Sequence, residues 1–158
     1  MENKTLFEET HYNKPLIILF LLVIFMFAII FIINWGSEGK QLTGLDLSII
    51  LLLVVLVLSL FNKININVFS KKMVISFGVG IIKKTFLLED IDITSIEKKK
   101  IPWYYGSGIR YVKGGILYNV KSGEAISFKL KNNKRYFIVI DRYNQLLDTL
   151  TGRVLDRL

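Results

Sequence analysis

The chain has 158 residues, a formal net charge of +8 and an apolar fraction of 52%, enough for one membrane segment and one small domain. It contains no cysteine and a single histidine, His11. Disulfides, thiolate metal sites and a cysteine nucleophile are therefore excluded, and no Ser/His/Asp set is expected. We expect His11 to be a solvated residue of a polar N-terminal leader, residues 1–14.

The first long apolar run covers Pro15 to Ile33, 19 residues without a charge. At about 1.5 Å per residue a helix of this length crosses about 28 Å, close to the hydrocarbon thickness of a bilayer. Pro15 suits the first turn of a helix, and Trp35 follows where interfacial aromatic residues are found. The run predicts a transmembrane helix. A cleaved signal peptide is the alternative, which the length of the run and the lack of a small-residue cleavage site disfavour.

A second apolar run, Leu45 to Phe61, follows after a linker of 11 residues, Asn34 to Gly44. The linker is too short for a domain, so both spans are expected to run antiparallel as a hairpin over residues 15–61. Lysines are more frequent after the second span than in the linker, which favours a multi-pass protein of the plasma membrane with both termini in the cytoplasm.

Residues 62–158 read as a separate domain with 18 basic and 8 acidic residues, a net charge of +10. Apolar–polar alternation and Gly or Asn turns predict a series of strands. The expected strands are Ile64–Val68, Met73–Phe77, Ile81–Leu88, Ile91–Ile96, Ile109–Val112, Ile116–Val120, Ala125–Leu130 and Arg135–Ile140. Apolar residues from Tyr143 onward recur at three- and four-residue spacing, which predicts a closing amphipathic helix.

The segments FGVGIIKKTFLLEDI, PWYYGSGIR and LYNVKSGEAISFKL, followed by this helix, resemble small bacterial two-span membrane proteins with a pleckstrin-homology-like (PH-like) domain. The resemblance implies a membrane α-hairpin plus a mainly-β PH-like domain of about seven strands with a C-terminal helix. It covers nearly the whole chain and implies fold and topology, but no reaction.

A basic and aromatic stretch follows the expected strand that ends at Ile96. Lysines attract anionic lipid, and Trp and Tyr are residues that rest at the headgroup level. The alternative is a solvated charge run followed by aromatic residues that cap the sheet. The candidate residues for contact with lipid or a partner are Lys98, Lys99, Lys100, Trp103, Tyr104, Tyr105 and Arg110.

The residues favour a non-enzymatic, membrane-anchored module that binds a protein partner or itself at the inner face of the membrane. The alternative is a sensor or binder of anionic lipid headgroups. Gly78-Val79-Gly80 is expected to be a turn rather than a phosphate loop, because strand residues follow it. No catalytic residue, cofactor or metal is expected, and no nucleic-acid motif accompanies the positive charge.

Overall fold

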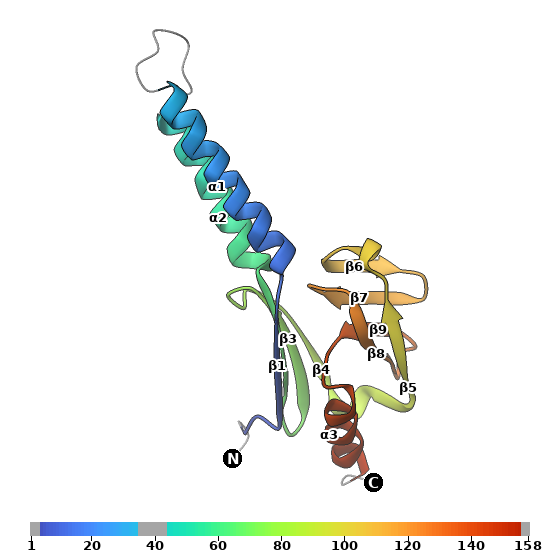
Figure 1. Cartoon of the computed structure of the whole chain (residues 1–158). Coiled ribbons are helices and arrows are strands. Elements are labelled where there is room, and N and C mark those ends of the chain that lie inside the picture. The colour runs from blue at the N-terminus through green and yellow to red at the C-terminus, as the bar shows by residue number, and fades with distance from the viewer. Residues whose placement is uncertain (1–3, 35–43, 156–158) are drawn as a thin grey trace.

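The computed structural model describes residues 4–34 and 44–155, which form two apolar helices and a β-rich domain of two sheets closed by a third helix (Figure 1). The apolar helices are α1 (Lys14–Asn34) and α2 (Gly44–Phe61), and the third is α3 (Tyr143–Leu155). Two short 3-10 helices, η1 (Leu88–Asp90) and η2 (Trp103–Tyr105), flank the longest strand.

The first sheet is antiparallel, with strand order β1-β2-β3-β4. Its strands are β1 (Phe7–Tyr12), β2 (Lys63–Val68), β3 (Lys72–Phe77) and β4 (Ile82–Leu87). The second sheet has the order β5-β8-β9-β7-β6. Its strands are β5 (Ile91–Ile101), β6 (Gly108–Val112), β7 (Gly115–Asn119), β8 (Gly123–Leu130) and β9 (Arg135–Val139).

The mainly-β character and the closing helix are confirmed, and the eight strands expected after the spans are all present. The estimate of about seven strands is too low, because the described residues form nine. The additional strand, β1, precedes the first apolar helix, where the sequence predicts only a polar leader. One pair, β7 with β9, is parallel, whereas the Gly and Asn turns between neighbouring strands predict only antiparallel hairpins.

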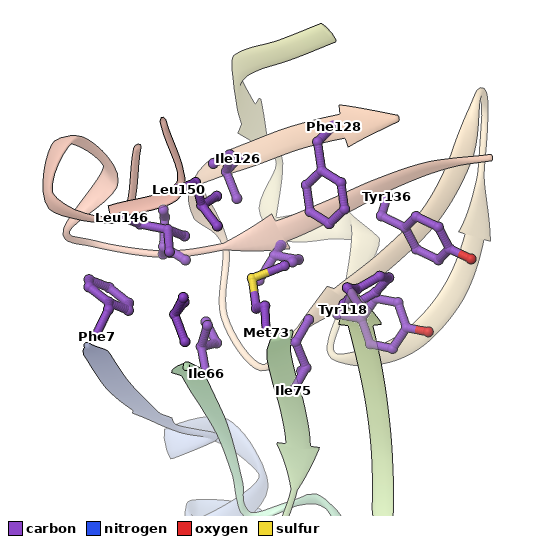
Figure 2. Packing of buried hydrophobic residues seen from close by; sticks show 14 of the residues in the cluster. Phe7, Ile66, Met73, Ile75, Tyr118, Ile126, Phe128, Tyr136, Leu146 and Leu150 are labelled. Atoms are coloured by element: carbon purple, nitrogen blue, oxygen red, sulfur yellow. The ribbon is translucent and has the colours of Figure 1, made fainter. Parts of the chain in front are cut away.

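The main core lies between the two sheets and α3 (Figure 2). Strand β2 alternates buried apolar and partly exposed polar side chains, so that Ile64, Ile66 and Val68 face the second sheet. Aromatic rings fill the centre, where Phe86 contacts Tyr136 edge to face at a centroid distance of 4.8 Å. Helix α3 covers one end of this core with Leu146, which is fully buried.

The apolar helices leave their side chains exposed on all sides of the hairpin, which is typical of helices that contact lipid. Within the described residues, one helix, Lys14–Ile33, is long and apolar enough to cross a membrane. The apolar part of α2, Ser48–Phe61, is shorter than such a span. Helix length alone therefore establishes one candidate span, and Trp35 lies outside the described residues.

The helices join the first sheet directly, without a linker. Strand β1 leads into α1 and α2 leads into β2, and these two strands pair with Tyr12 opposite Lys63. At the junction the Asn13 backbone N–H donates to the Asn62 carbonyl at 2.7 Å, and the Asn13 carboxamide oxygen accepts from the Leu16 N–H at 3.3 Å. Asn13 thus caps α1 and fixes its start at the end of α2.

Candidate functional site

The aromatic residues that the sequence singles out are exposed in the structure. Trp103 and Tyr104 lie in η2 with exposed fractions of 81% and 67%, and their rings contact each other edge to face at 6.3 Å. Strand β6 follows and adds Ile109 and Tyr111, of which Tyr111 is 88% exposed. We call Trp103, Tyr104 and Tyr111, together with the neighbouring Ile109, the aromatic surface. Large rings left in solvent on neighbouring segments are typical of a contact surface.

Exposed apolar residues of the β-rich domain gather at the end from which the apolar helices emerge (Figure 1). Outside the helices, eight large apolar residues are exposed among the described residues: Tyr12, Val79, Ile81, Leu87, Trp103, Tyr104, Ile109 and Tyr111. All except Leu87 belong to the end of β1, the β3–β4 turn, η2 or β6. The opposite end carries α3 and the start of β1. The domain therefore has one apolar end, and it faces the helices.

The expected strand ends at Ile96, which would leave the lysine run in a loop. In the structure β5 instead continues through the lysine run to Ile101. Lys98 forms an ion pair with Glu124 at 2.7 Å and lies over the Tyr143 ring of α3 at 5.3 Å. Lys99 instead pairs with Glu97 at 2.9 Å. Neighbouring side chains of a strand point to opposite faces, so the three lysines do not form one surface with the aromatic residues.

Tyr105 and Arg110 have structural roles in the domain. Tyr105 is half-buried against a small apolar cluster on the outer face of the second sheet, which includes Phe137. An Arg110 guanidinium N–H donates to the Ser107 carbonyl and fixes the turn between η2 and β6. Arg110 is therefore a residue that orders this turn rather than a free cation.

A cavity of about 440 Å³ lies beside the small apolar cluster. We call it the basic pocket, and its lining residues are Lys99, Lys100, Ile101, Tyr105, Val112, Lys113, Gly114, Arg135 and Phe137. Four of them are cationic, and they come from β5, the β6–β7 turn and β9. Three residues chosen from the sequence, Lys99, Lys100 and Tyr105, belong to it, whereas Lys113 and Arg135 were not foreseen.

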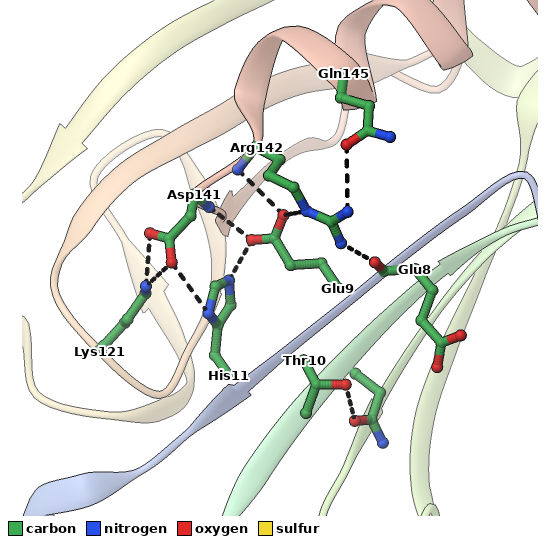
Figure 3. A network of polar contacts seen from close by, with 9 residues as sticks. Glu8, Glu9, Thr10, His11, Lys121, Asp141, Arg142 and Gln145 are labelled. Atoms are coloured by element: carbon green, nitrogen blue, oxygen red, sulfur yellow. Dashed lines mark hydrogen bonds and ion pairs between the residues drawn. The ribbon is translucent and has the colours of Figure 1, made fainter.

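A buried polar cluster joins β1 to the start of α3 (Figure 3). Glu9 is 5% exposed and accepts hydrogen bonds from the backbone N–H groups of Asp141 and Arg142, at 2.6 and 3.1 Å. The Arg142 side chain donates to the same carboxylate at 3.2 Å and to the Glu8 carbonyl. Glu9 therefore binds the two backbone N–H groups that directly precede α3, close to the positive end of the helix dipole, although it lies on another strand.

His11 belongs to this cluster, and the expectation of a solvated histidine is wrong, because its exposed fraction is 6%. Its Nε2 atom lies 2.5 Å from Glu9 Oε1, and its Nδ1 atom lies 3.6 Å from Asp141 Oδ2. The Nε2 contact is close but not aligned as a hydrogen bond, so Nε2 lacks a hydrogen-bond partner. Lys121 binds Asp141 from the other side with its Nζ atom 2.6 Å from Oδ1.

Glu9, His11 and Asp141 each offer one ligand atom, and these atoms lie within 4.8 Å of one another. A metal ion would have to displace Lys121 from Asp141 and Arg142 from Glu9. We interpret the cluster as a polar clamp between β1 and α3.

The pKa of His11 is lowered from its ordinary value of 6.5, first because burial disfavours the imidazolium and then because Lys121 is near, with Glu9 and Asp141 opposing. The unfolded chain therefore binds this proton at higher pH than the folded chain. We expect the stability of the protein to fall as the pH drops below 6.5, and His11→Gln to remove this dependence.

Thermal unfolding of both proteins in neutral detergent between about pH 7.5 and 5.5 measures the difference in slope. Lys121 hydrogen-bonds Asp141 and holds the pKa of that carboxyl below its usual range, so Asp141 stays charged in this window. Equal slopes for the two proteins would show that His11 does not take up the proton.

Comparison of the chain with protein-family models, with curated proteins and with solved structures gives no match, so its function must be argued from its own geometry.

Proposed function

We propose that the protein is an integral membrane protein in which α1 and α2 cross the bilayer as a hairpin. The β-rich domain rests with its aromatic surface in the headgroup layer, on the cytoplasmic side together with both termini. There it binds membrane lipid as a non-enzymatic module. The observation that carries this proposal is the gathering of exposed apolar side chains at the end of the domain that faces the apolar helices.

The connection of the helices to the first sheet supports a hairpin. Because β1 pairs with β2, the start of α1 and the end of α2 are fixed side by side. A chain that crosses the bilayer through α1 must then return through α2, whose 18 residues extend about 27 Å. A cleaved signal peptide is disfavoured, because cleavage after α1 would remove β1 and with it Phe7, which is 3% exposed in the core.

The rigid junction makes weak lipid contacts effective. The Val79 N–H in the β3–β4 turn donates to the Ser59 carbonyl of α2 at 3.0 Å, in addition to the contacts of Asn13. A domain held in this way has already lost most of its freedom of orientation, so each contact with the bilayer costs little further entropy. Trp103, Tyr104 and Tyr111 supply an apolar body and a polar tip, which suits the interface between headgroups and acyl chains.

Quenching of tryptophan fluorescence by brominated lipid tests the placement. The chain has two tryptophans, so Trp35→Phe leaves Trp103 as the only one. In nanodiscs of lipid brominated near the headgroup we expect strong quenching of Trp103. The matched control adds Trp103→Phe and Phe69→Trp, which moves the tryptophan to the β2–β3 turn at the opposite end of the first sheet and should leave it unquenched.

Equal, negligible quenching of both tryptophans would contradict the lipid contact. The aromatic surface would then be available to a protein partner or to a second copy of the chain, which is the function that the sequence favours first. The same surface serves either role, since Trp and Tyr are also enriched at protein interfaces.

A further inference from the structure

We infer that the basic pocket binds a phosphate group, carried either by a lipid headgroup or by a soluble phosphomonoester. Lys99, Lys113 and Arg135 converge on this cavity from three separate segments, whereas Lys100 lines it from β5 with its side chain on the other face of the strand. Among the described residues, Glu97 is the acidic residue that forms ion pairs with these cations. Its Oε2 atom lies 2.9 Å from Lys99 Nζ and 3.4 Å from a guanidinium nitrogen of Arg135. Gathering like charges in this way costs stability, which an anionic ligand would offset.

One of these cations is available to a ligand without the loss of an ion pair. Lys113 is exposed, and it forms no ion pair in the part of the chain that the structure describes. Lysine ammonium groups bind phosphate as point charges, and the planar guanidinium of Arg135 can donate two parallel hydrogen bonds to it. The pocket thus combines the two kinds of phosphate donor.

The floor of the pocket is apolar, because Ile101, Val112 and Phe137 form it. An apolar floor excludes water from one side of a bound anion and strengthens its attraction to the surrounding cations. The volume of about 440 Å³ lies within the usual range for small-molecule sites. It leaves room for a phosphate together with a small organic group, such as glycerol.

The pairing of β7 with β9 fixes the position of Lys113 beside Arg135. Strands β7 and β9 approach closely at Gly115, where an added Cβ would lie 2.3 Å from the Arg135 carbonyl oxygen. Only glycine fits between these backbones, so the β6–β7 turn is held against the base of Arg135. The backbone positions of Lys113 and Arg135 are therefore fixed before a ligand binds, which reduces the entropy lost on binding.

Calorimetric titration of the full chain in neutral detergent tests the inference. The probes are glycerol 3-phosphate, dihexanoyl phosphatidic acid, and dihexanoyl phosphatidylcholine as the lipid with the same chains and no net headgroup charge. We expect saturable binding of a phosphomonoester probe. Each of Lys99→Gln and Lys113→Gln should weaken it about fivefold, and the double change about 25-fold. Lys83→Gln removes an exposed lysine from the first sheet and should leave binding unchanged.

Binding of glycerol 3-phosphate would identify the phosphate alone as the ligand, whereas binding of phosphatidic acid only would identify a lipid headgroup. The inference is overturned if neither phosphomonoester binds, or if both lipids bind equally and the lysine changes have no effect. It does not depend on the aromatic surface touching the bilayer, because the fluorescence experiment tests that contact separately.

Discussion

Replacement of Glu9 by alanine is expected to lower the free energy of unfolding by about 3–5 kcal/mol. The Glu9 carboxylate accepts from the backbone N–H groups of Asp141 and Arg142 and from the Arg142 side chain. Its removal leaves buried donors at the start of α3 without partners, and it leaves His11 without a neighbouring carboxylate on one side. The contact between β1 and α3 is then lost.

Thermal unfolding in neutral detergent measures this effect, and we expect the Tm to fall by more than about 10 °C for a domain of this size. Glu8→Ala is the matched control. Glu8 is the preceding residue on the same strand, its side chain is exposed, and only its backbone carbonyl contacts Arg142. Its replacement should change stability by less than about 0.5 kcal/mol. Similar losses for the two variants would show that Glu9 does not connect β1 to α3.

The strands after the two apolar helices could be predicted because their turns and their alternation are local signals. Strand β1 could not, although its burial also alternates. Its inward positions are Phe7, Glu9 and His11, and two of these are polar residues that sequence patterns assign to solvent. Their burial makes sense only beside Asp141 and Arg142, more than 125 residues away in the chain. Phe7 is the only apolar residue at these inward positions.

The candidate site was predicted only in part, because some of its residues also come together through long-range contacts. The exposure of Trp103 and Tyr104 follows from their place in a turn between strands. Lys98 was grouped with its neighbours, but Glu124 on the paired strand β8 binds it instead. Lys113 and Arg135 reach the basic pocket only through the pairing of β7 with β9, which is parallel. Such a long-range contact leaves no periodic pattern in the sequence.

Gly78→Ala is expected to destabilise the domain by about 3 kcal/mol and to loosen its connection to the helices. Gly78 has a φ of +53°, and an added Cβ would lie 1.9 Å from the Ser59 carbonyl oxygen of α2. No side-chain rotation can relieve this clash, because the Ser59 carbonyl oxygen belongs to the backbone. The β3–β4 turn must therefore move away from α2, which breaks the hydrogen bond from the Val79 N–H to the Ser59 carbonyl.

Gly80→Ala, in the same turn, separates steric contact from backbone strain. Gly80 also has a positive φ, +90°, but nothing lies within 4 Å of an added Cβ, so the expected loss is the strain alone, about 1 kcal/mol. Thermal unfolding ranks the two variants, and the brominated-lipid experiment on Trp103 reports the position of the domain. If the junction holds the aromatic surface at the bilayer, Gly78→Ala should reduce the quenching of Trp103 while Gly80→Ala preserves it. Unchanged quenching in a destabilised Gly78→Ala protein would mean that the strand pair β1–β2 alone orients the domain.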